Sequence, residues 1–209
     1  MTGQRGDTRR RVRETALTLF ADKTYGATTL QDIADATGVT KAALYYYFRT
    51  KEEILADLVE PAIAELEEIL DRAEGQSFSP AATRELLLAM GELYAGDRRR
   101  LIILMFDRTF KSVPVLGERA MVCRERTQQA LARGCAHDSA GDVRAIAALA
   151  ALTVPLAVLE GYEDLRSLVA PAVAAACAVL GIRPPRGNAA VTGEATKPVP
   201  GKAPTATVG

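Results

Sequence analysis

The segment from Thr28 to Phe48, TTLQDIADATGVTKAALYYYF, constrains the fold more than any other part of this 209-residue chain. Thr29 and Asp32 have the spacing of a capping box, in which side-chain oxygens accept the free amides at the start of a helix. Gly38 can end that helix in the left-handed conformation, and Thr40 can cap a second helix. Two short helices joined by a turn of about three or four residues form a helix–turn–helix.

The second helix of this motif separates into two faces at about 100° per residue. Leu44 and Phe48 share one face and fit a core. The residues on the other side are small at first and carry hydroxyl groups further along. They are Lys41, Ala42, Ala43, Tyr45, Tyr46 and Tyr47. A helix in the DNA major groove needs this taper, because short side chains let the backbone approach base edges and longer donors then reach phosphates.

The alternative interpretation of the three consecutive tyrosines is that they pack in a core and form its polar rim. Consecutive helical residues point about 100° apart, so all three cannot be buried together. Leu44 and Phe48 already fill the core face. At least one tyrosine must therefore face outward.

Charge is unevenly distributed although the net charge is zero. Residues 1–51 hold nine Lys or Arg against five Asp or Glu, and the stretch from Arg183 holds four against one, which leaves the middle at minus seven. A basic head on an acidic body suits DNA, because phosphates attract the head and repel the rest. The alternative is that the arginines at positions 9, 10, 11 and 13 only keep the first helix soluble.

The motif and its flanks resemble the DNA-binding domain of the tetracycline-repressor (TetR) family of bacterial transcription regulators. The resemblance covers about the first 60 residues. Its residues are Ala16, Leu19, Phe20, Tyr25, Gly26, the threonine pair at 28 and 29, Ile33, Ala34, Gly38 to Lys41, Leu44, Tyr45, Phe48 and Thr50 to Glu53.

The resemblance implies roles for the matching positions. Residues facing DNA would be Thr29, Thr40, Lys41, Ala42, Ala43, Tyr45, Tyr46 and Tyr47, with Lys51 reaching a phosphate from the next helix. Tyr47 departs from the family, in which many members have histidine there. Ala42 and Ala43 offer only methyl contacts, for instance to a thymine. We therefore expect few hydrogen bonds to bases and a large share of phosphate contacts and DNA-shape recognition.

The rest of the chain predicts an all-α protein of about nine helices, because no window alternates apolar and polar residues as a strand would. We expect a helix–turn–helix domain at 1–50, a helical effector-binding and dimerisation domain at 51–183, and a disordered tail at 184–209, which is rich in Gly, Pro, Ala and Thr. Thr50 and Glu53 predict another capping box, and Pro61 predicts a kink or break near Asp57.

Two uncharged runs, Ala145–Leu159 and Ser167–Ile182, are too short to span a bilayer and are interrupted by Pro155 and Pro171. Helices that are apolar on nearly every side need a covering partner, so we expect a homodimer with a four-helix interface. The predicted interface residues are Ile146, Leu149, Leu152, Leu156, Leu168, Val169, Val173, Ala176 and Leu180. The alternative is that both helices form the core of a monomer.

An effector pocket is expected because the family resemblance implies one in the C-terminal body. Its candidate lining combines methionines and aromatic residues, which make an adaptable wall. The candidates are Met90, Tyr94, Met105, Phe106, Phe110, Met121 and Leu156, with Asp107, Arg108 and Arg98 to Arg100 as candidates for its mouth. The alternative for each apolar residue is ordinary core packing.

Catalysis and metal binding are disfavoured. Cys123, Cys135 and Cys177 have no paired spacing and predict free thiols in a reducing cytoplasm, and His137 is the single histidine. This leaves no Ser-His-Asp set, phosphate-binding loop or metal-ligand cluster, and no cofactor is expected.

We predict a cytoplasmic repressor that binds a palindromic operator as a dimer and is released by a small, hydrophobic effector. The alternative is a dimeric DNA-binding regulator without an effector.

Overall fold

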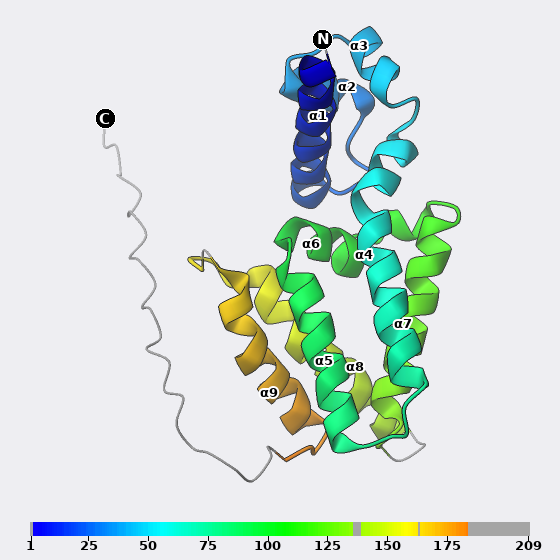
Figure 1. The fold of residues 1–209 in the computed structure, drawn as a ribbon, viewed down its shortest axis with the longest axis vertical. Coiled ribbons are helices and arrows are strands. Elements are labelled where there is room, and N and C mark those ends of the chain that lie inside the picture. Colours follow the sequence, from blue (N-terminus) through cyan, green and yellow to red (C-terminus); the bar gives the residue numbers. More distant parts are fainter. Residues whose placement is uncertain (1, 136–138, 163, 184–209) are drawn as a thin grey trace, which may run out of the picture.

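The computed structural model describes residues 2–135, 139–162 and 164–183, and every regular element within these ranges is a helix (Figure 1). The all-α prediction is therefore confirmed. His137 and the predicted tail at 184–209 lie outside the described residues. We call α1–α3 the head and α4–α9 the body.

The head consists of α1 (Thr2–Lys23), α2 (Leu30–Thr37) and α3 (Lys41–Tyr47). The predicted caps form as the sequence suggested. The Thr29 hydroxyl accepts from the Asp32 amide at 3.1 Å, and the Asp32 carboxylate accepts from the Thr29 amide at 2.8 Å. Gly38 ends α2 with φ 71°, and the Thr40 hydroxyl accepts from the Ala43 amide at 3.1 Å. Local side-chain chemistry thus sets the turn between the two short helices.

The long helix α4 (Lys51–Glu74) begins in the head and continues down the body (Figure 1). A kink or break was expected near Asp57, and the break is wrong, because the helix passes through Pro61 uninterrupted. Pro61 has no amide to offer the Asp57 carbonyl, and the Arg13 guanidinium of α1 donates to that carbonyl instead, at 3.1 Å. Only half of the second capping box forms, since Glu53 accepts from the Arg49 amide rather than from Thr50.

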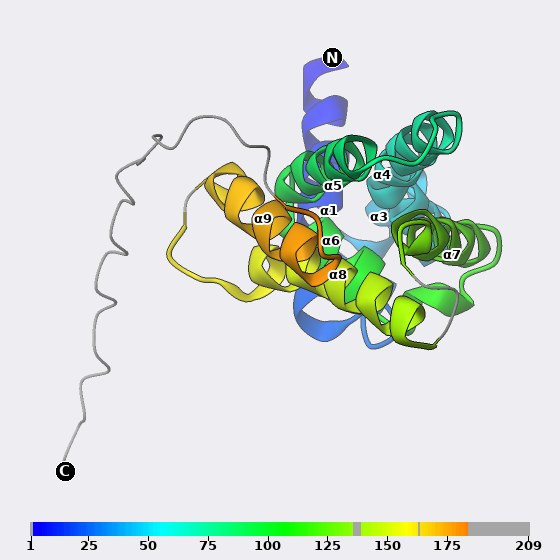
Figure 2. The ribbon, with the colours of Figure 1, turned by 90° about the horizontal axis from the view of Figure 1, so that it is seen from below.

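The body also contains α5 (Pro80–Ala95), α6 (Arg98–Phe106), α7 (Leu116–Ala132), α8 (Ser139–Val158) and α9 (Val169–Val179), with 3-10 turns η1 (Phe110–Ser112) and η2 (Leu165–Leu168). Seen from below, α8 and α9 lie side by side, α7 lies beside α4, and α5 lies between α4 and α9 (Figure 2). Asp97 sets the start of α6, because its carboxylate accepts from the Arg99 amide at 3.0 Å.

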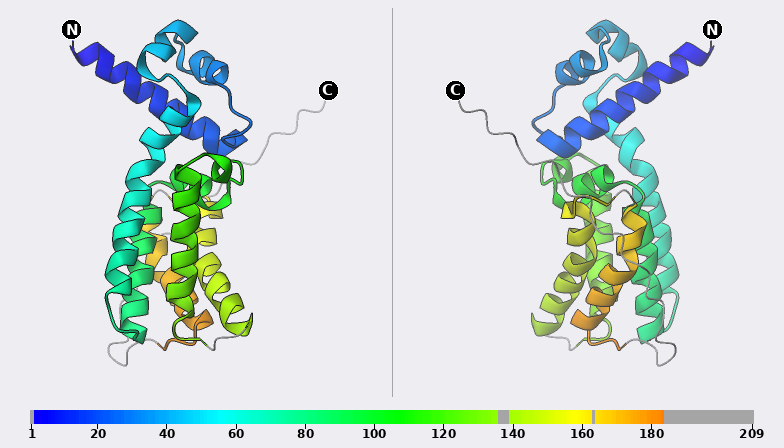
Figure 3. Two further views of the ribbon diagram at one scale, coloured as in Figure 1. Left: turned by 90° about the vertical axis from the view of Figure 1, so that its right-hand side faces the viewer. Right: turned by 90° about the vertical axis from the view of Figure 1, so that its left-hand side faces the viewer.

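The head stands on the end of the body where α6 lies (Figure 3). α6 contacts α1, and the first part of α4 also packs against α1. The core is continuous through this junction, from Phe20 and Phe48 in the head to Ile54 and Leu58 on α4. The two parts are therefore packed together rather than joined by a flexible linker.

One helix, α8, is long and apolar enough by composition to cross a membrane. It is longer than the uncharged run predicted, because it begins at Ser139 and includes Asp142 and Arg144. It packs against α5, α6, α7 and α9. A core helix of a water-soluble bundle meets the same criterion.

The close contact of α5 with α9 generates the first prediction. A Cβ added at Gly91 would lie 2.7 Å from the Val169 Cγ1 atom and 3.4 Å from the Leu152 Cδ1 atom. Gly91→Ala should therefore destabilise the protein by about 1 kcal/mol in urea unfolding, because overpacking typically costs ~1–3 kcal/mol and outweighs the ~1 kcal/mol gain in helix propensity.

The control is the same change in a chain carrying Val169→Ala, which removes the clashing methyl groups. In that background Gly91→Ala should be stabilising. A stabilising effect in the otherwise unchanged protein would show that α5 and α9 are not in the close contact described.

Candidate DNA interface and its connection to the body

The helix α3 has one buried and one exposed face. Leu44 and Phe48 are completely buried, whereas the side chains of Tyr46 and Tyr45 are 67% and 45% exposed. Lys41 and Ala42 are also exposed, and Ala43 is half-buried. The alternative of a buried tyrosine cluster is therefore wrong for two of the three tyrosines.

Tyr47 is intermediate between these faces. It is half-buried against the core, and its ring meets that of Tyr46 edge-on with centroids 5.2 Å apart. The predicted DNA-facing residues of α3 thus form one continuous surface, with Tyr47 at its border. Contact of this surface with DNA remains a prediction.

Thr29 and Thr40 lie at the starts of α2 and α3 and are both exposed. Their hydroxyl groups accept the helix-capping hydrogen bonds. The hydroxyl and amide of Thr29 also hold the pKa of Asp32 below its ordinary value. Both threonines therefore build the motif, whatever they contact on DNA.

The expectation for Lys51 needs correction. Its ammonium donates to the carbonyl oxygens of Tyr25 and Thr28, each at 2.8 Å, and lies 4.2 Å from the centroid of the Tyr25 ring. The side chain is directed at the turn between α1 and α2 rather than away from the protein. Sequence spacing placed Lys51 at the right helix start but could not show that two carbonyl groups converge on it.

The arginines of α1 hold the head together. Arg9 and Arg13 both form ion pairs with Asp57 on α4, at 3.2 and 3.0 Å. Arg11 donates to the carbonyl oxygen of Thr37 at the end of α2, at 2.6 Å. The sequence suggested that these arginines either attract DNA or keep the helix soluble. In the structure they instead link α1 to α4 and to α2.

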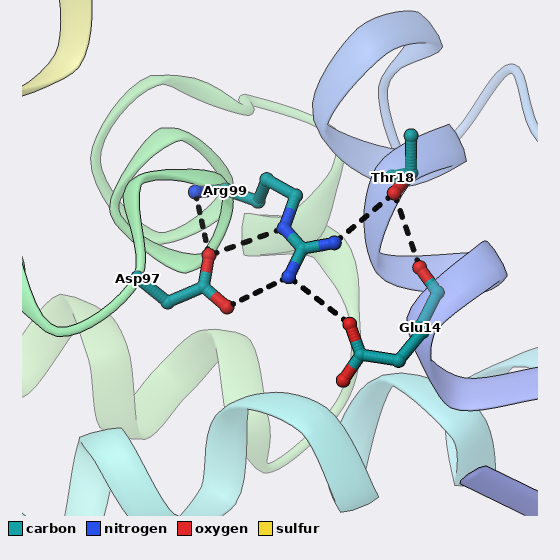
Figure 4. A network of polar contacts seen from close by, with 4 residues as sticks. All are labelled: Glu14, Thr18, Asp97 and Arg99. Carbon is teal, nitrogen blue, oxygen red and sulfur yellow. Dashed lines mark hydrogen bonds and ion pairs between the residues drawn. The ribbon is translucent and has the colours of Figure 1, made fainter. Parts of the chain in front are cut away.

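The helix α6 is bonded to the head at its first turn (Figure 4). Arg99 forms ion pairs with Asp97, at 3.1 Å, and with Glu14 of α1, at 3.0 Å. It also donates to the Thr18 hydroxyl at 3.2 Å. Asp97 orients the guanidinium, and α1 supplies the remaining acceptors.

The loop after α6 is bonded to the turn between α1 and α2. The buried carboxylate of Asp107 accepts from the Tyr25 amide at 2.5 Å, and also from the amide and hydroxyl of Thr109. The Gly26 amide donates to the Thr109 hydroxyl at 2.8 Å. A Cβ at Gly26 would lie 2.8 Å from the Thr109 Cγ2 atom, so the glycine permits this approach. Sequence reasoning missed this contact, which joins residues about 80 positions apart.

The predicted effector pocket is only partly assembled. Met105, Phe106 and Met121 line a cavity of about 150 Å³ between α6, α7 and α8. The other predicted residues, Met90, Tyr94, Phe110 and Leu156, are buried in the core and do not line it. The charged residues proposed for its mouth are also absent from its lining, and Lys111 and Arg124 are present instead.

The predicted dimer interface also needs correction. Ile146 and Leu149 line the cavity, and the other seven residues are buried within the protomer. These seven are Leu152, Leu156, Leu168, Val169, Val173, Ala176 and Leu180. The stripes of α8 and α9 that carry the larger apolar side chains are buried where these helices pack on each other and on α5, which removes most apolar surface from water.

A different apolar surface is left uncovered, which we call the α8–α9 face. It comprises Val143, Ala147, Ala150, Val154 and Val158 of α8 and Ala170, Pro171, Ala174, Ala175, Ala178 and Val179 of α9. Ala150 and Val154 lie at its border, because they also line the cavity. Ala147 is half-buried and the others are exposed. All of these side chains are uncharged.

The three cysteines are free thiols. Burial raises the pKa of Cys123 and of Cys177 above the ordinary thiol value, so both are held in the unreactive thiol form. Among the described residues no group of three or more His, Cys, Asp or Glu is placed to hold a metal ion.

A capped helix–turn–helix with an exposed second helix, packed on a helical body, defines the class of helix–turn–helix transcription regulators. Residues 12–58 match the profile of the bacterial regulatory proteins of the tetR family. The chain is 32% identical over 120 residues to the HTH-type transcriptional regulator AcrR of Shigella flexneri, covering 56% of this chain and 54% of AcrR. It is 40% identical over 62 residues to the repressor KstR2 of Mycolicibacterium smegmatis, covering 28% and 30%. The similarity to the tetR family is thus carried by residues 12–58.

Solved structures show the same fold. The ketosteroid regulator KstR2 of Mycobacterium tuberculosis superimposes with a TM-score of 0.64 at 21% identity, covering 87% of this chain and 95% of that one. PfmR of Thermus thermophilus gives 0.59 at 24% identity, covering 82% and 97%. The sequence matches span about half of the length of AcrR and under a third of that of KstR2.

The position of Lys51 generates the second prediction. Lys51→Ala should lower the free energy of unfolding by about 1–3 kcal/mol, because two carbonyl groups lose charge-assisted hydrogen bonds. The matched control is Lys41→Ala, an exposed lysine at the start of α3, which should change stability by less than about 0.5 kcal/mol. Urea unfolding measures both, and equal midpoints would contradict the structural role of Lys51.

Proposed function

We propose that the protein is a ligand-responsive repressor that binds a near-palindromic operator as a homodimer. The observation that carries the proposal is the division of α3, whose apolar face is fully buried while Lys41, Tyr45 and Tyr46 face outward. Among the relatives, KstR2 is named a transcriptional repressor and IcaR of Staphylococcus epidermidis a negative transcriptional regulator, which supports repression over activation.

The chemistry of the exposed face indicates how DNA would be read. Ala42 allows close approach to the groove floor, and the tyrosine hydroxyls and the Lys41 ammonium are donors for phosphate oxygens. Base-specific hydrogen bonds are few on such a surface, so DNA shape supplies much of the selectivity. Two copies of α3 in a dimer would meet half-sites about 34 Å apart, or a multiple of this distance.

The third prediction concerns this face. Selection from random duplexes should yield a two-fold-symmetric, salt-sensitive footprint. Lys41→Ala should weaken binding to all duplexes alike and reduce the salt slope by about 1, whereas Tyr46→Ala should change the preferred sequence. Arg72→Ala, an exposed cation near the far end of α4, is the control and should leave both unchanged.

Fluorescence anisotropy over a range of salt concentrations measures these effects. Absence of any symmetric footprint would overturn the proposal. Equal, sequence-independent effects of the Lys41 and Tyr46 changes would overturn the separate roles assigned to them.

The α8–α9 face supports the homodimer. Four of its six α9 residues are alanine, and small side chains let helices approach closely. Uncharged apolar faces of this kind are covered in soluble proteins, and a two-fold pairing of α8 and α9 would cover it with the same face of a second copy.

The fourth prediction tests this pairing. Ala174→Glu, in the middle of the exposed stripe of α9, should convert the dimer to a monomer in sedimentation equilibrium, because two carboxylates would be buried without partners. Val122→Glu places the same charge on an exposed valine of α7 and should leave the dimer intact. A dimer that survives the Ala174 change, or a monomeric parent protein, would contradict this interface.

An effector role is supported by the cavity beside α6, whose two ends are bonded to the head. A regulator without an effector is the alternative, and a cavity that no small molecule enters would favour it. Free thiols and a DNA target are consistent with a cytoplasmic location.

A further inference from the structure

Two cations line the apolar cavity between α6, α7 and α8. Lys111 comes from η1 and Arg124 from α7. Neither forms an ion pair or hydrogen bond within the described part of the chain. The neighbouring arginines of α7 behave differently, since Arg119 binds Glu60 and Glu67 and Arg126 binds Asp71 and Glu74.

The charges with the largest effect on Lys111 are positive, and the carboxylates of Glu118 and Glu125 line a second hollow on its other side. Burial, and then the charges of Arg124 and Arg108, lower the pKa of Lys111 below its ordinary value. The backbone of Lys111 lies close to the start of α7, since a Cβ at Gly117 would collide with the Lys111 carbonyl group. An anion placed between Lys111 and Arg124 would relieve the repulsion and the cost of partial burial.

The cavity beside these cations is apolar. Its walls include Met105 and Leu149, and the partly exposed side chains of Met121 and Ile146, which are 47% and 49% exposed. Methionine side chains adapt to ligands of different shape. A ligand with an alkyl tail would cover these exposed apolar groups while its charged end remained near the surface.

We propose that this cavity binds an amphipathic anion, an alkyl carboxylate of medium length, with its tail between α6, α7 and α8 and its carboxylate on Lys111 and Arg124. The inference rests on the proposed function in treating this cavity as the effector site. It excludes cationic ligands, which the two cations would repel, and it ranks neutral ligands below anions of the same shape.

The site adjoins the contact between body and head. Phe106 and Lys111 line the cavity and flank the loop in which Asp107 and Thr109 bond to Tyr25 and Gly26. A carboxylate bound to Lys111 therefore lies within four residues of Asp107. The buried contact of Asp107 with the turn between α1 and α2 positions α2 and α3. This places the bound ligand where it can change operator affinity.

The fifth prediction is a binding series on the full-length protein by titration calorimetry. Decanoate should bind at least tenfold more tightly than decanol, and decyltrimethylammonium should not bind. Octanoate should bind more weakly than decanoate by about fourfold per methylene group removed, as expected for a buried alkyl tail. Equal affinities of decanoate and decanol would overturn the proposal.

Variants test the binding of the ligand's carboxylate separately from the binding of its alkyl tail. Lys111→Gln and Arg124→Gln should each weaken decanoate about tenfold and leave decanol unchanged. Arg108→Gln removes the same charge from an exposed neighbour that does not line the cavity, and should have little effect. Ala120→Phe fills the cavity and should abolish binding of both ligands. Equal loss of decanoate binding in the Arg108 and Arg124 variants would contradict a site on Arg124.

Operator binding in the presence of decanoate distinguishes this inference from the proposed function. If decanoate binds with the expected charge dependence and operator affinity is unchanged, the ligand class stands and release by this ligand is wrong. If no alkyl carboxylate binds while the protein still footprints a symmetric operator, the ligand inference is wrong and the DNA-binding function stands.

Discussion

The contact between the loop after α6 and the turn between α1 and α2 fixes the position of α2 and α3 relative to the body. The polar groups of Tyr25 are all taken by neighbours: its amide by Asp107, its carbonyl by Lys51 and its hydroxyl by Glu52. Burial and the bond to Glu52 raise the pKa of the Tyr25 hydroxyl. Buried hydrogen-bonding groups are costly to leave without partners, so the head cannot shift relative to the body unless these bonds are exchanged for others.

The same principle explains the role of α6. Arg99 ties its first turn to α1, and Asp107 and Thr109 tie its end to the turn that follows α1. The body around it is held in two ways. On one side, arginines of α7 pair with carboxylates of α4, and on the other, α8 and α9 pack through apolar side chains. The cavity lies between these regions, against α6, which is bonded to the head at its first turn and just after its end. A ligand there would act on an element that is bonded directly to the head.

Charged residues illustrate how far sequence reasoning reached. The excess of basic residues in the head was visible as a count, and DNA attraction was a reasonable explanation. In the structure, Arg9 and Arg13 neutralise Asp57, and Arg13 also satisfies the carbonyl that Pro61 leaves free. The Lys51 ammonium donates hydrogen bonds to two carbonyl groups of the neighbouring turn. Such partners come from distant positions, and a charge in a sequence does not reveal which of them will be within reach. The two cations of the cavity, Lys111 and Arg124, were missed for the same reason.

The sequence by itself determined the elements that depend on local chemistry. Thr29, Asp32, Gly38 and Thr40 act on amides a few residues away, and the period of α3 separates Leu44 and Phe48 from Tyr45 and Tyr46. Only the tertiary structure decided which apolar face of each helix meets which neighbour. Periodicity orients a side chain about its own helix axis but does not orient the helix against the others. Leu152 and Val173 therefore became core, Ala150 and Ala174 became surface, and the cavity formed around Met105 and Met121 rather than Met90 and Tyr94.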